Sequence, residues 1–170
     1  MTLRMRDPAP SLDLGLAGGG RFRLGERPPK AFTLVVFYRG LHCHRCNDYL
    51  NGYQALLDDF AKLGVEVVAV SSDSQERAEQ SKRDWKLSAL AVGYGLSIEA
   101  GRAWGLFISR GVRSDEPAIF TEPALYVIDR DGKLVFGVIN SVTRMRPPAA
   151  DVLGMIERVA ENRDSARGDA

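Results

Sequence analysis

Cysteine is scarce in this sequence: two occur among 170 residues, and they lie close together at Cys43 and Cys46. The chain also lacks any apolar run approaching the roughly 20 residues of a membrane-spanning helix. Its start lacks the apolar region typical of a secretory signal. These absences predict a cytoplasmic protein without a membrane segment. A chain of this size can bury about 70% of its unfolded surface, so it needs no disulfide for stability.

Charge of either sign is not in excess, because 23 lysine and arginine residues stand against 22 aspartate and glutamate residues. This balance gives no electrostatic reason to expect nucleic acid or an anionic membrane as a partner. Hydrophobic residues make up 45% of the chain and charged residues 26%, which is typical of a globular domain. We therefore expect one domain over residues 1–161, followed by a polar, frayed C-terminal tail over residues 162–170.

The pattern of apolar residues predicts an α/β fold with a mixed central β-sheet flanked by helices. Two runs rich in β-branched residues, 32–38 and 65–71, are typical of strands buried on both faces. Between them, apolar side chains recur every three or four positions up to Leu63 and indicate a helix that ends at Gly64. Two strands joined through a helix form a right-handed unit with parallel strands. The other expected elements are an N-terminal hairpin within residues 11–24, a helix over 74–86, a short strand within 87–94, a short helix over 97–104, a loop over 112–119, a hairpin of strands 124–129 and 133–139, and a last helix from Pro147.

The segment Cys43-His-Arg-Cys46 falls where the first buried strand gives way to a helix. A helix N-terminus carries partial positive charge and unpaired N–H groups, and both stabilise a thiolate. Cysteines in such places have pKa values between about 3.5 and 7.5. Two residues between the sulfurs allow the second cysteine to close a disulfide within one helical turn and expel whatever the first has bound. We therefore expect Cys43 to be the more exposed attacking thiol of a redox site and Cys46 its resolving partner.

Three other interpretations of the cysteine pair stay open. A structural disulfide would close a loop too short to constrain much of the chain. A zinc site needs four ligands, and the only other soft donors, His42 and His44, lie too close to the cysteines to complete it. The third interpretation is a pair of inert, reduced cysteines. We expect neither a metal nor a cofactor.

Charged side chains near the cysteines are candidates for supporting roles. Arg39 and Arg45 add positive charge that lowers a thiol pKa, and a protonated His42 would add more. Glu122 is a candidate proton relay, with an exposed acidic side chain as the alternative. Pro123 lies at the first position of a strand, where its missing N–H is tolerated.

Three segments resemble those of a known family. The segment from Phe37 to Cys46 resembles the strand-to-CxxC region of thioredoxin-like proteins. It is most similar to the peroxiredoxin-like branch of the alkyl hydroperoxide reductase/thiol-specific antioxidant (AhpC/TSA) family. Residues 65–73 and 123–132 resemble two further segments of that family, so that the resemblance extends over nearly the whole chain.

The resemblance implies a thioredoxin-like fold and a cis peptide bond before Pro123, which would face the cysteines and hold an extended substrate backbone. It also implies electrons drawn from a cellular dithiol reductant of the thioredoxin, glutaredoxin or glutathione type. Related folds pair through sheet edges or helix faces, so the choice between a monomer and a homodimer stays open.

The sequence differs from peroxiredoxins at positions that serve peroxide reduction. Peroxiredoxins have a proline six residues and a threonine or serine three residues before the attacking cysteine, where this sequence has Phe37 and Gly40. The arginine that helps to orient peroxide in peroxiredoxins aligns with Pro123 of this sequence, so it is missing here. These differences favour a thiol–disulfide oxidoreductase with an antioxidant or redox-homeostasis role, which exchanges the Cys43/Cys46 dithiol with a protein or small-molecule disulfide. One alternative is a peroxidase that reduces hydrogen peroxide or alkyl hydroperoxides through a sulfenic acid on Cys43. A second is a non-catalytic redox sensor or binding module.

Overall fold

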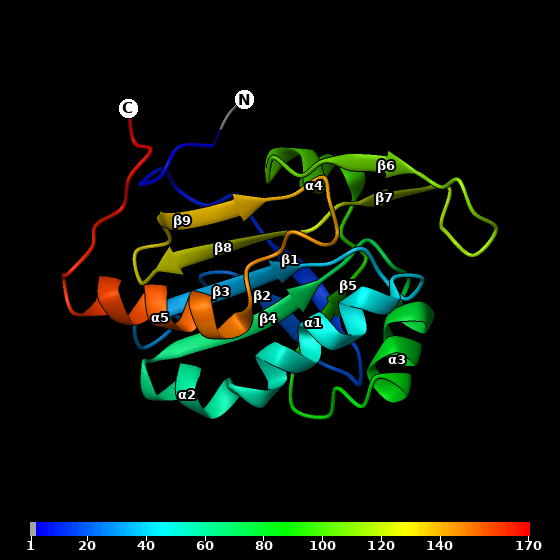
Figure 1. Ribbon diagram of the computed structural model, residues 1–170, viewed down its shortest axis with the longest axis horizontal. Coiled ribbons are helices and arrows are strands. Elements are labelled where there is room, and N and C mark those ends of the chain that lie inside the picture. Colours follow the sequence, from blue (N-terminus) through cyan, green and yellow to red (C-terminus); the bar gives the residue numbers. More distant parts are fainter. Residues whose placement is uncertain (1–2) are drawn as a thin grey trace.

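The computed structural model describes residues 3–170 (Figure 1). Within that range, seven strands form one mixed sheet in the order β2-β1-β5-β4-β3-β8-β9, and β6 and β7 form a separate hairpin. The strands are β1 (Asp13–Leu16), β2 (Arg21–Arg23), β3 (Phe32–Phe37), β4 (Val65–Val70), β5 (Ala91–Tyr94), β6 (Ile108–Arg110), β7 (Ile119–Thr121), β8 (Ala124–Asp129) and β9 (Leu134–Ile139). The helices are α1 (His44–Ala55), α2 (Leu57–Lys62), α3 (Gln75–Asp84), α4 (Ile98–Ala103) and α5 (Ala149–Ala160).

The order of the strands brings the end of β3 and the start of β8 to one edge of the sheet. β3 and β4 are parallel, with Phe37 opposite Val70, which confirms the expected strand–helix–strand unit. β8 is antiparallel to β3, and Ala124 lies opposite Phe37. Since α1 begins at His44, shortly after β3 ends, the two cysteines lie beside the residues that precede β8.

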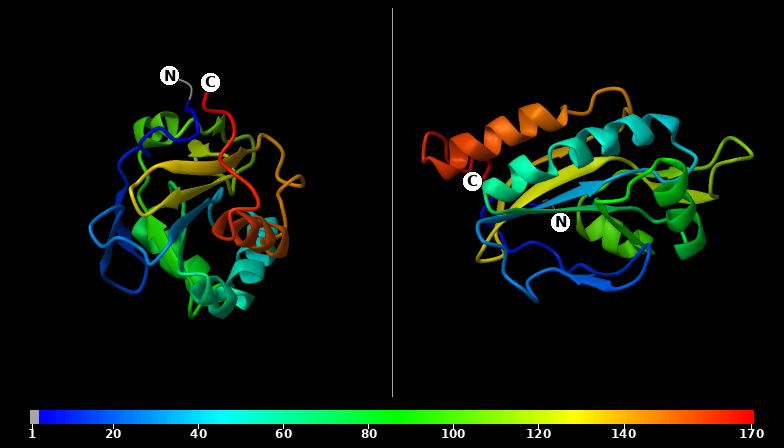
Figure 2. Two further views of the ribbon diagram at one scale, coloured as in Figure 1. Left: turned by 90° about the vertical axis from the view of Figure 1, so that its left-hand side faces the viewer. Right: turned by 90° about the horizontal axis from the view of Figure 1, so that it is seen from below.

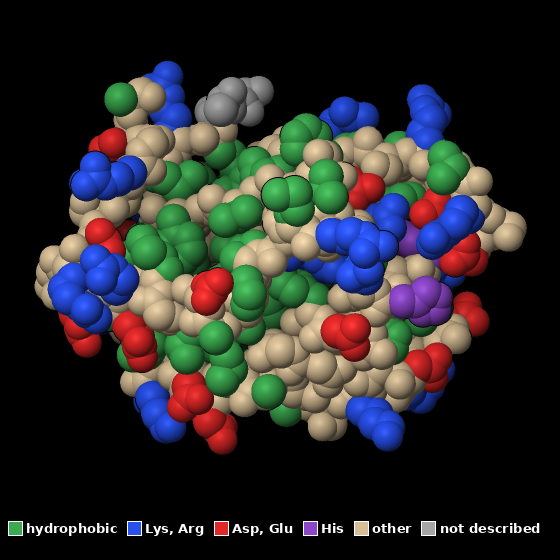
Figure 3. All heavy atoms as spheres, in the orientation of Figure 1, with side chains coloured by type: hydrophobic (Ala, Val, Ile, Leu, Met, Phe, Trp, Pro, Cys, Tyr) green, Lys and Arg blue, Asp and Glu red, His purple; other side chains and the backbone are tan. Residues whose placement is uncertain are grey.

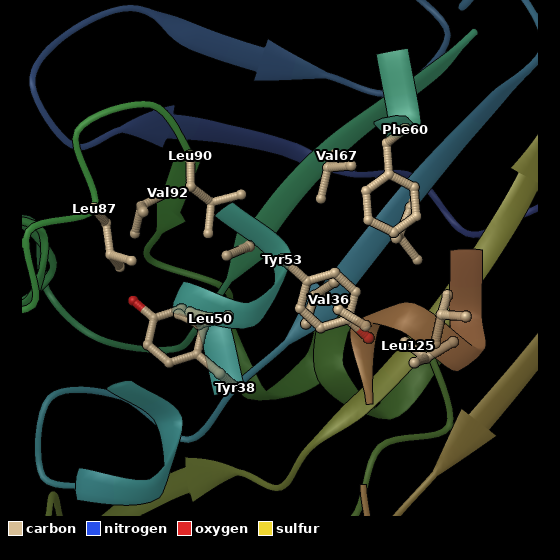
Figure 4. Packing of buried hydrophobic residues seen from close by; sticks show 14 of the residues in the cluster. Val36, Tyr38, Leu50, Tyr53, Phe60, Val67, Leu87, Leu90, Val92 and Leu125 are labelled. Carbon is tan, nitrogen blue, oxygen red and sulfur yellow. The ribbon is translucent and has the colours of Figure 1, made fainter. Parts of the chain in front are cut away.

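Two hydrophobic cores lie on opposite faces of the sheet, because successive side chains of a strand point to opposite sides. In β3, Leu34 and Val36 belong to the first core, and Val35 and Phe37 belong to the second. Figure 2 shows α1, α2 and α5 along one face of the sheet, and α4 lies on the other face, where Ala100 packs against the second core. The first core includes Leu50, Tyr53, Phe60, Ala78, Val152 and Ile156 from four helices, and part of it is drawn in Figure 4.

Two features of the fold differ from the expected elements. The helix after the cysteines is interrupted at Leu56, whose φ of −108° and ψ of 9° separate α1 from α2. No glycine or proline marks that break in the sequence. The segment expected to be a loop is the tip of the β6–β7 hairpin, in which Ile108 pairs with Thr121. Strands of three residues are too short to show a period of two, so the sequence pattern missed them.

The N-terminal hairpin is present and extends the sheet, since Gly15 of β1 pairs with Tyr94 of β5.

Residues 161–170 contain no helix or strand, and the carbonyl of Gly168 accepts a hydrogen bond from the backbone N–H of Met5 at 3.0 Å. None of the helices formed by residues 3–170 combines the length and apolarity needed to cross a bilayer.

Candidate functional site: a thiol pair at the start of a helix

Cys43 and Cys46 occupy the first turn of α1, as the sequence predicts. Cys43 is the N-cap residue, with extended backbone angles and no side-chain capping bond, and Cys46 lies inside the helix. The backbone N–H of Cys46 donates to the carbonyl of Cys43 at 2.8 Å. Unpaired N–H groups and the helix dipole therefore both favour negative charge at this point.

The turn before Cys43 is held by a buried carboxylate. Asp73, three residues after the end of β4, accepts a hydrogen bond from the backbone N–H of Leu41 at 2.7 Å. Its other oxygen accepts one from Nε of Arg77 at 2.9 Å. Gly40 has a φ of +121°, and a Cβ atom placed there would lie 2.6 Å from Oδ2 of Asp73. The position where peroxiredoxins have threonine or serine is therefore restricted to glycine in this chain.

The two sulfurs differ in burial and in acidity. Cys43 is 5% exposed and Cys46 is fully buried, so that Cys43 is the outer thiol but far more enclosed than expected. A hydrogen bond from the Cys46 side chain, together with the positive charges of Arg146 and Arg39, lowers the pKa of Cys43 to about 6 against the opposing effect of burial. Burial raises the pKa of Cys46 well above its ordinary value. At neutral pH the pair therefore holds one thiolate, on Cys43, and one thiol, on Cys46.

Arg146 is a site residue that the sequence analysis missed. It lies between β9 and α5, and its Nη1 donates a hydrogen bond to the sulfur of Cys46 at 3.3 Å. Its guanidinium carbon lies 4.3 Å from the ring centroid of Tyr49, the geometry of a cation–π contact. The segment around Arg146 shows neither periodicity nor a motif, so no signal in the sequence assigns it to the cysteines.

Arg39 and Glu122 meet in a largely buried network next to the thiols. Nε of Arg39 lies 3.0 Å from Oε2 of Glu122, and Nη2 lies 3.4 Å from Oε1 of Glu116. Ser109 donates a hydrogen bond to Glu122 at 2.6 Å. Glu122 is therefore a buried, paired carboxylate, and the alternative of an exposed acidic side chain is wrong. The Arg39 guanidinium also covers the ring of Phe120, 4.7 Å from its centroid.

His42 does not supply the positive charge expected of it. Its side chain is buried against Phe120, with 4.6 Å between ring centroids, and neither ring nitrogen has a hydrogen-bond partner within residues 3–170. Burial, followed by the charge of Arg39, lowers the pKa of His42 to about 4. The imidazole is therefore neutral at pH 7.

The peptide bond before Pro123 differs from expectation. The described chain contains no cis peptide bond, so the bond before Pro123 is trans and the expected cis bond is wrong. Glu122 donates its backbone N–H to the carbonyl of Phe107 at 2.8 Å, which ties the residue before the proline to the segment leading into β6.

Arg45 is exposed on the first turn of α1, beside Arg146 in a surface pocket. In the described part of the chain, no three His, Cys, Asp or Glu side chains converge as a metal site would require.

A mixed sheet with helices on both faces and a thiol pair at the N-terminus of α1 defines a thioredoxin-like fold with a candidate redox site. The sequence model of the AhpC/TSA family matches residues 5–136, and the chain belongs to this family. No curated protein sequence matches the chain significantly.

Solved structures of peroxiredoxins share the fold. Peroxidoxin BcpB from Mycobacterium tuberculosis matches with a TM-score of 0.74 and 16% identity, covering 93% of this chain and 98% of that one. A mutant of peroxiredoxin 6 from Arenicola marina matches with a TM-score of 0.82 and 15% identity, covering 96% and 76%. A proposed thiol:disulfide interchange protein, DsbE from Chlorobium tepidum, matches with a TM-score of 0.69 and 19% identity, covering 94% and 99%.

Proposed function

We propose that this chain is a thiol–disulfide oxidoreductase that cycles Cys43 and Cys46 between dithiol and disulfide in a reducing compartment. The observation that carries the proposal is the opposite displacement of two thiol pKa values within one helical turn. A thiolate at the outer position is a nucleophile at neutral pH. The protonated thiol beside it does not compete for the substrate and becomes the attacking group in the second step.

The cycle begins when the Cys43 thiolate attacks one sulfur of a substrate disulfide. A mixed disulfide forms on Cys43, and the other half of the substrate leaves as a thiolate. Cys46 then loses its proton and attacks the sulfur of Cys43, which releases the second half of the substrate. Arg146, 3.3 Å from the sulfur of Cys46, stabilises the thiolate that this step requires. Two electrons pass from the protein to the substrate, and a cellular thiol reductant returns them.

A peroxidase is the second candidate function, and the enclosure of Cys43 favours it. A side chain that is 5% exposed admits a small oxidant more readily than a protein disulfide. The Cys43 thiolate would attack the outer peroxide oxygen and become a sulfenic acid while the alcohol or water leaves. Cys46 would then form the disulfide and release water. Gly40 and Pro123, which stand where peroxiredoxins have other residues, weigh against this candidate.

The two candidates are separated by the oxidant that the reduced protein consumes. Stopped-flow mixing with hydrogen peroxide is expected to oxidise Cys43 no faster than a free thiol, while a small disulfide reacts faster than it does with a free thiol. A Cys46→Ser variant, which cannot complete the second step, is expected to trap a mixed disulfide that mass spectrometry identifies.

Cys43→Ser is the matched control, because it removes the attacking sulfur and leaves Cys46. Full turnover by Cys43→Ser with both oxidants would overturn both candidates. Fast oxidation by peroxide alone would replace the oxidoreductase with the peroxidase. If the disulfide forms but no reductant supports turnover, the protein is a redox sensor and not an enzyme.

A further inference from the structure

An open pocket of about 280 Å³ lies where the first turns of α1 meet the segment between β9 and α5, and one of its lining residues, Arg146, contacts the sulfur of Cys46. Three arginines line it: Arg45 from α1, and Arg144 and Arg146 from the segment. Asp48 is the only acidic side chain in its lining within the described residues. Figure 3 shows lysine and arginine side chains gathered over this region. The pocket therefore carries an excess of positive charge one side chain away from Cys46, although the whole chain is nearly neutral.

Arg146 connects this pocket to the sulfurs and is fixed on three sides. Its Nε donates to the carbonyl of Thr143 at 2.9 Å, its Nη1 donates to Cys46, and its guanidinium carbon lies over the ring of Tyr49. Its Nη2 has no hydrogen-bond partner within residues 3–170. A guanidinium held in place with N–H groups left over is suited to bind a carboxylate, because little side-chain entropy is lost on binding.

We propose that this pocket, called here the arginine pocket (Arg45, Arg144 and Arg146), binds the carboxylates of a small anionic thiol that reduces the Cys43–Cys46 disulfide. The inference rests on the proposed function, since it names the class of reductant for the same site. Glutathione, which carries two carboxylates and one thiol, is the probe that represents this class.

The contact of Arg146 with Cys46 also serves the reductive half of the cycle. The first thiolate attacks the sulfur of Cys43, the more exposed of the pair, and the disulfide bond breaks with Cys46 leaving as a thiolate. Arg146 already contacts the sulfur on which that negative charge appears. A second thiolate attacks the mixed disulfide and releases Cys43. Two thiols are thus oxidised to one low-molecular-weight disulfide, and the protein regains its dithiol.

Burial of the thiols agrees with a small donor. Cys43 is 5% exposed and Cys46 is fully buried, so a protein dithiol would have to displace surrounding side chains to reach either sulfur. A small thiol whose carboxylates are anchored on Arg45 and Arg144 needs a narrower opening to reach Cys43. The anchoring also raises the local concentration of its sulfur beside Cys43.

The test compares glutathione with its diethyl ester, which keeps the thiol but lacks both carboxylate charges. Protein oxidised to the Cys43–Cys46 disulfide is mixed with each thiol, and the second-order rate constant is scaled to the thiolate concentration. Wild type is expected to react about tenfold faster with glutathione. An Arg45→Gln/Arg144→Gln double variant, which leaves the sulfur contact of Arg146 in place, is expected to lose most of this preference. Added salt is expected to reduce the preference in wild type.

Arg130→Gln is the matched control, because it removes one exposed arginine from the turn between β8 and β9, at the other end of the sheet. It is expected to keep the wild-type preference. Equal rate constants for the two donors, or a preference that the double variant keeps, would overturn the arginine pocket. If a thioredoxin-type dithiol reduces the disulfide quickly and wild type shows no preference, the inference fails and the proposed oxidoreductase stands. If the disulfide does not form at all, the proposed function fails as well.

Discussion

Arg146 donates a hydrogen bond to the sulfur of Cys46 across 3.3 Å, although the two residues are 100 positions apart in the chain. Peroxiredoxins have an arginine at the position of Pro123, at the start of β8. In this chain the positive charges that act on Cys43 come from Arg146, in the segment before α5, and from Arg39, directly before the turn that leads to the cysteines.

Replacing Arg146 is expected to make Cys43 less acidic. In Arg146→Met a side chain of similar length without charge removes one of the groups that lower the pKa of Cys43. We expect that pKa to rise by about 1, as is usual when an opposite charge within a few ångströms is lost. The pH profile of iodoacetamide alkylation measures it. Arg144→Met, an exposed neighbour without a sulfur contact, is the control, and identical profiles for both variants would contradict the assignment.

The reactivity of Cys43 is expected to depend on pH with a midpoint near 6. Its thiolate is the reactive form, so alkylation reaches a plateau above that pH and falls about tenfold for each unit below it. Since an unfolded cysteine titrates at about 8.5, the thiolate stabilises the reduced fold. This contribution is fully present above about pH 8.5 and is lost as the pH falls through about 6.

Urea unfolding of the reduced wild type and of Cys43→Ser, at pH 9 and pH 5, tests the predicted contribution of the Cys43 thiolate to stability. The difference in unfolding free energy between the two proteins is expected to be larger at pH 9. A difference that does not change with pH would show that Cys43 is not a thiolate in the folded protein.

Introducing the threonine of peroxiredoxins at position 40 is expected to damage the site. The φ of Gly40 disfavours any side chain, and its Cβ would meet the carboxylate of Asp73 at 2.6 Å. We expect Gly40→Thr to lower the free energy of unfolding by about 2–4 kcal/mol. The control is Gly132→Ala, whose φ is +76° and whose Cβ would meet no atom within 4 Å; it should cost about 1 kcal/mol. Equal losses in urea unfolding would mean that Asp73 moves aside freely.

His42 is expected to be replaceable by an apolar residue. Both ring nitrogens are buried without partners within residues 3–170, and burying unpaired polar atoms is unfavourable. His42→Leu should therefore change the free energy of unfolding by less than about 1 kcal/mol. It should also leave the pH profile of Cys43 in place, since a neutral ring carries no charge. The control is His44→Leu, which replaces the exposed histidine two positions further along the chain. A loss above about 2 kcal/mol in urea unfolding would reveal a bound partner of the imidazole.

The location of the thiol pair could be predicted from sequence because its signals are local. A continuous apolar run ends at Tyr38, a helical period begins after Cys46, and the cysteines lie between the two. Elements marked by continuous apolar runs, such as β3 and β8, are where the sequence pattern places them.

The surroundings of the pair could not be predicted, because they depend on how distant segments pack. Phe120, which buries His42, lies on a strand of three residues that shows no period. Arg146 reaches Cys46 only because the segment before α5 lies against α1 in the folded chain. The protonation state of His42 follows from that packing and not from its position in the motif.

Glu122 is expected to act on Cys43 through Arg39. Glu122→Gln preserves the size of the side chain and an oxygen for Ser109, but it removes the charge that faces Nε of Arg39. Breaking a largely buried ion pair should lower the free energy of unfolding by about 1–3 kcal/mol. Because the charge of Arg39 is then less compensated, the pKa of Cys43 should fall further. A double-mutant cycle with Arg39→Met, measured by urea unfolding and by the alkylation profile, isolates the coupling. Additive effects in both measurements would mean that Glu122 and Arg39 act independently, and a slower redox cycle without any change in the alkylation profile would favour Glu122 as a proton relay.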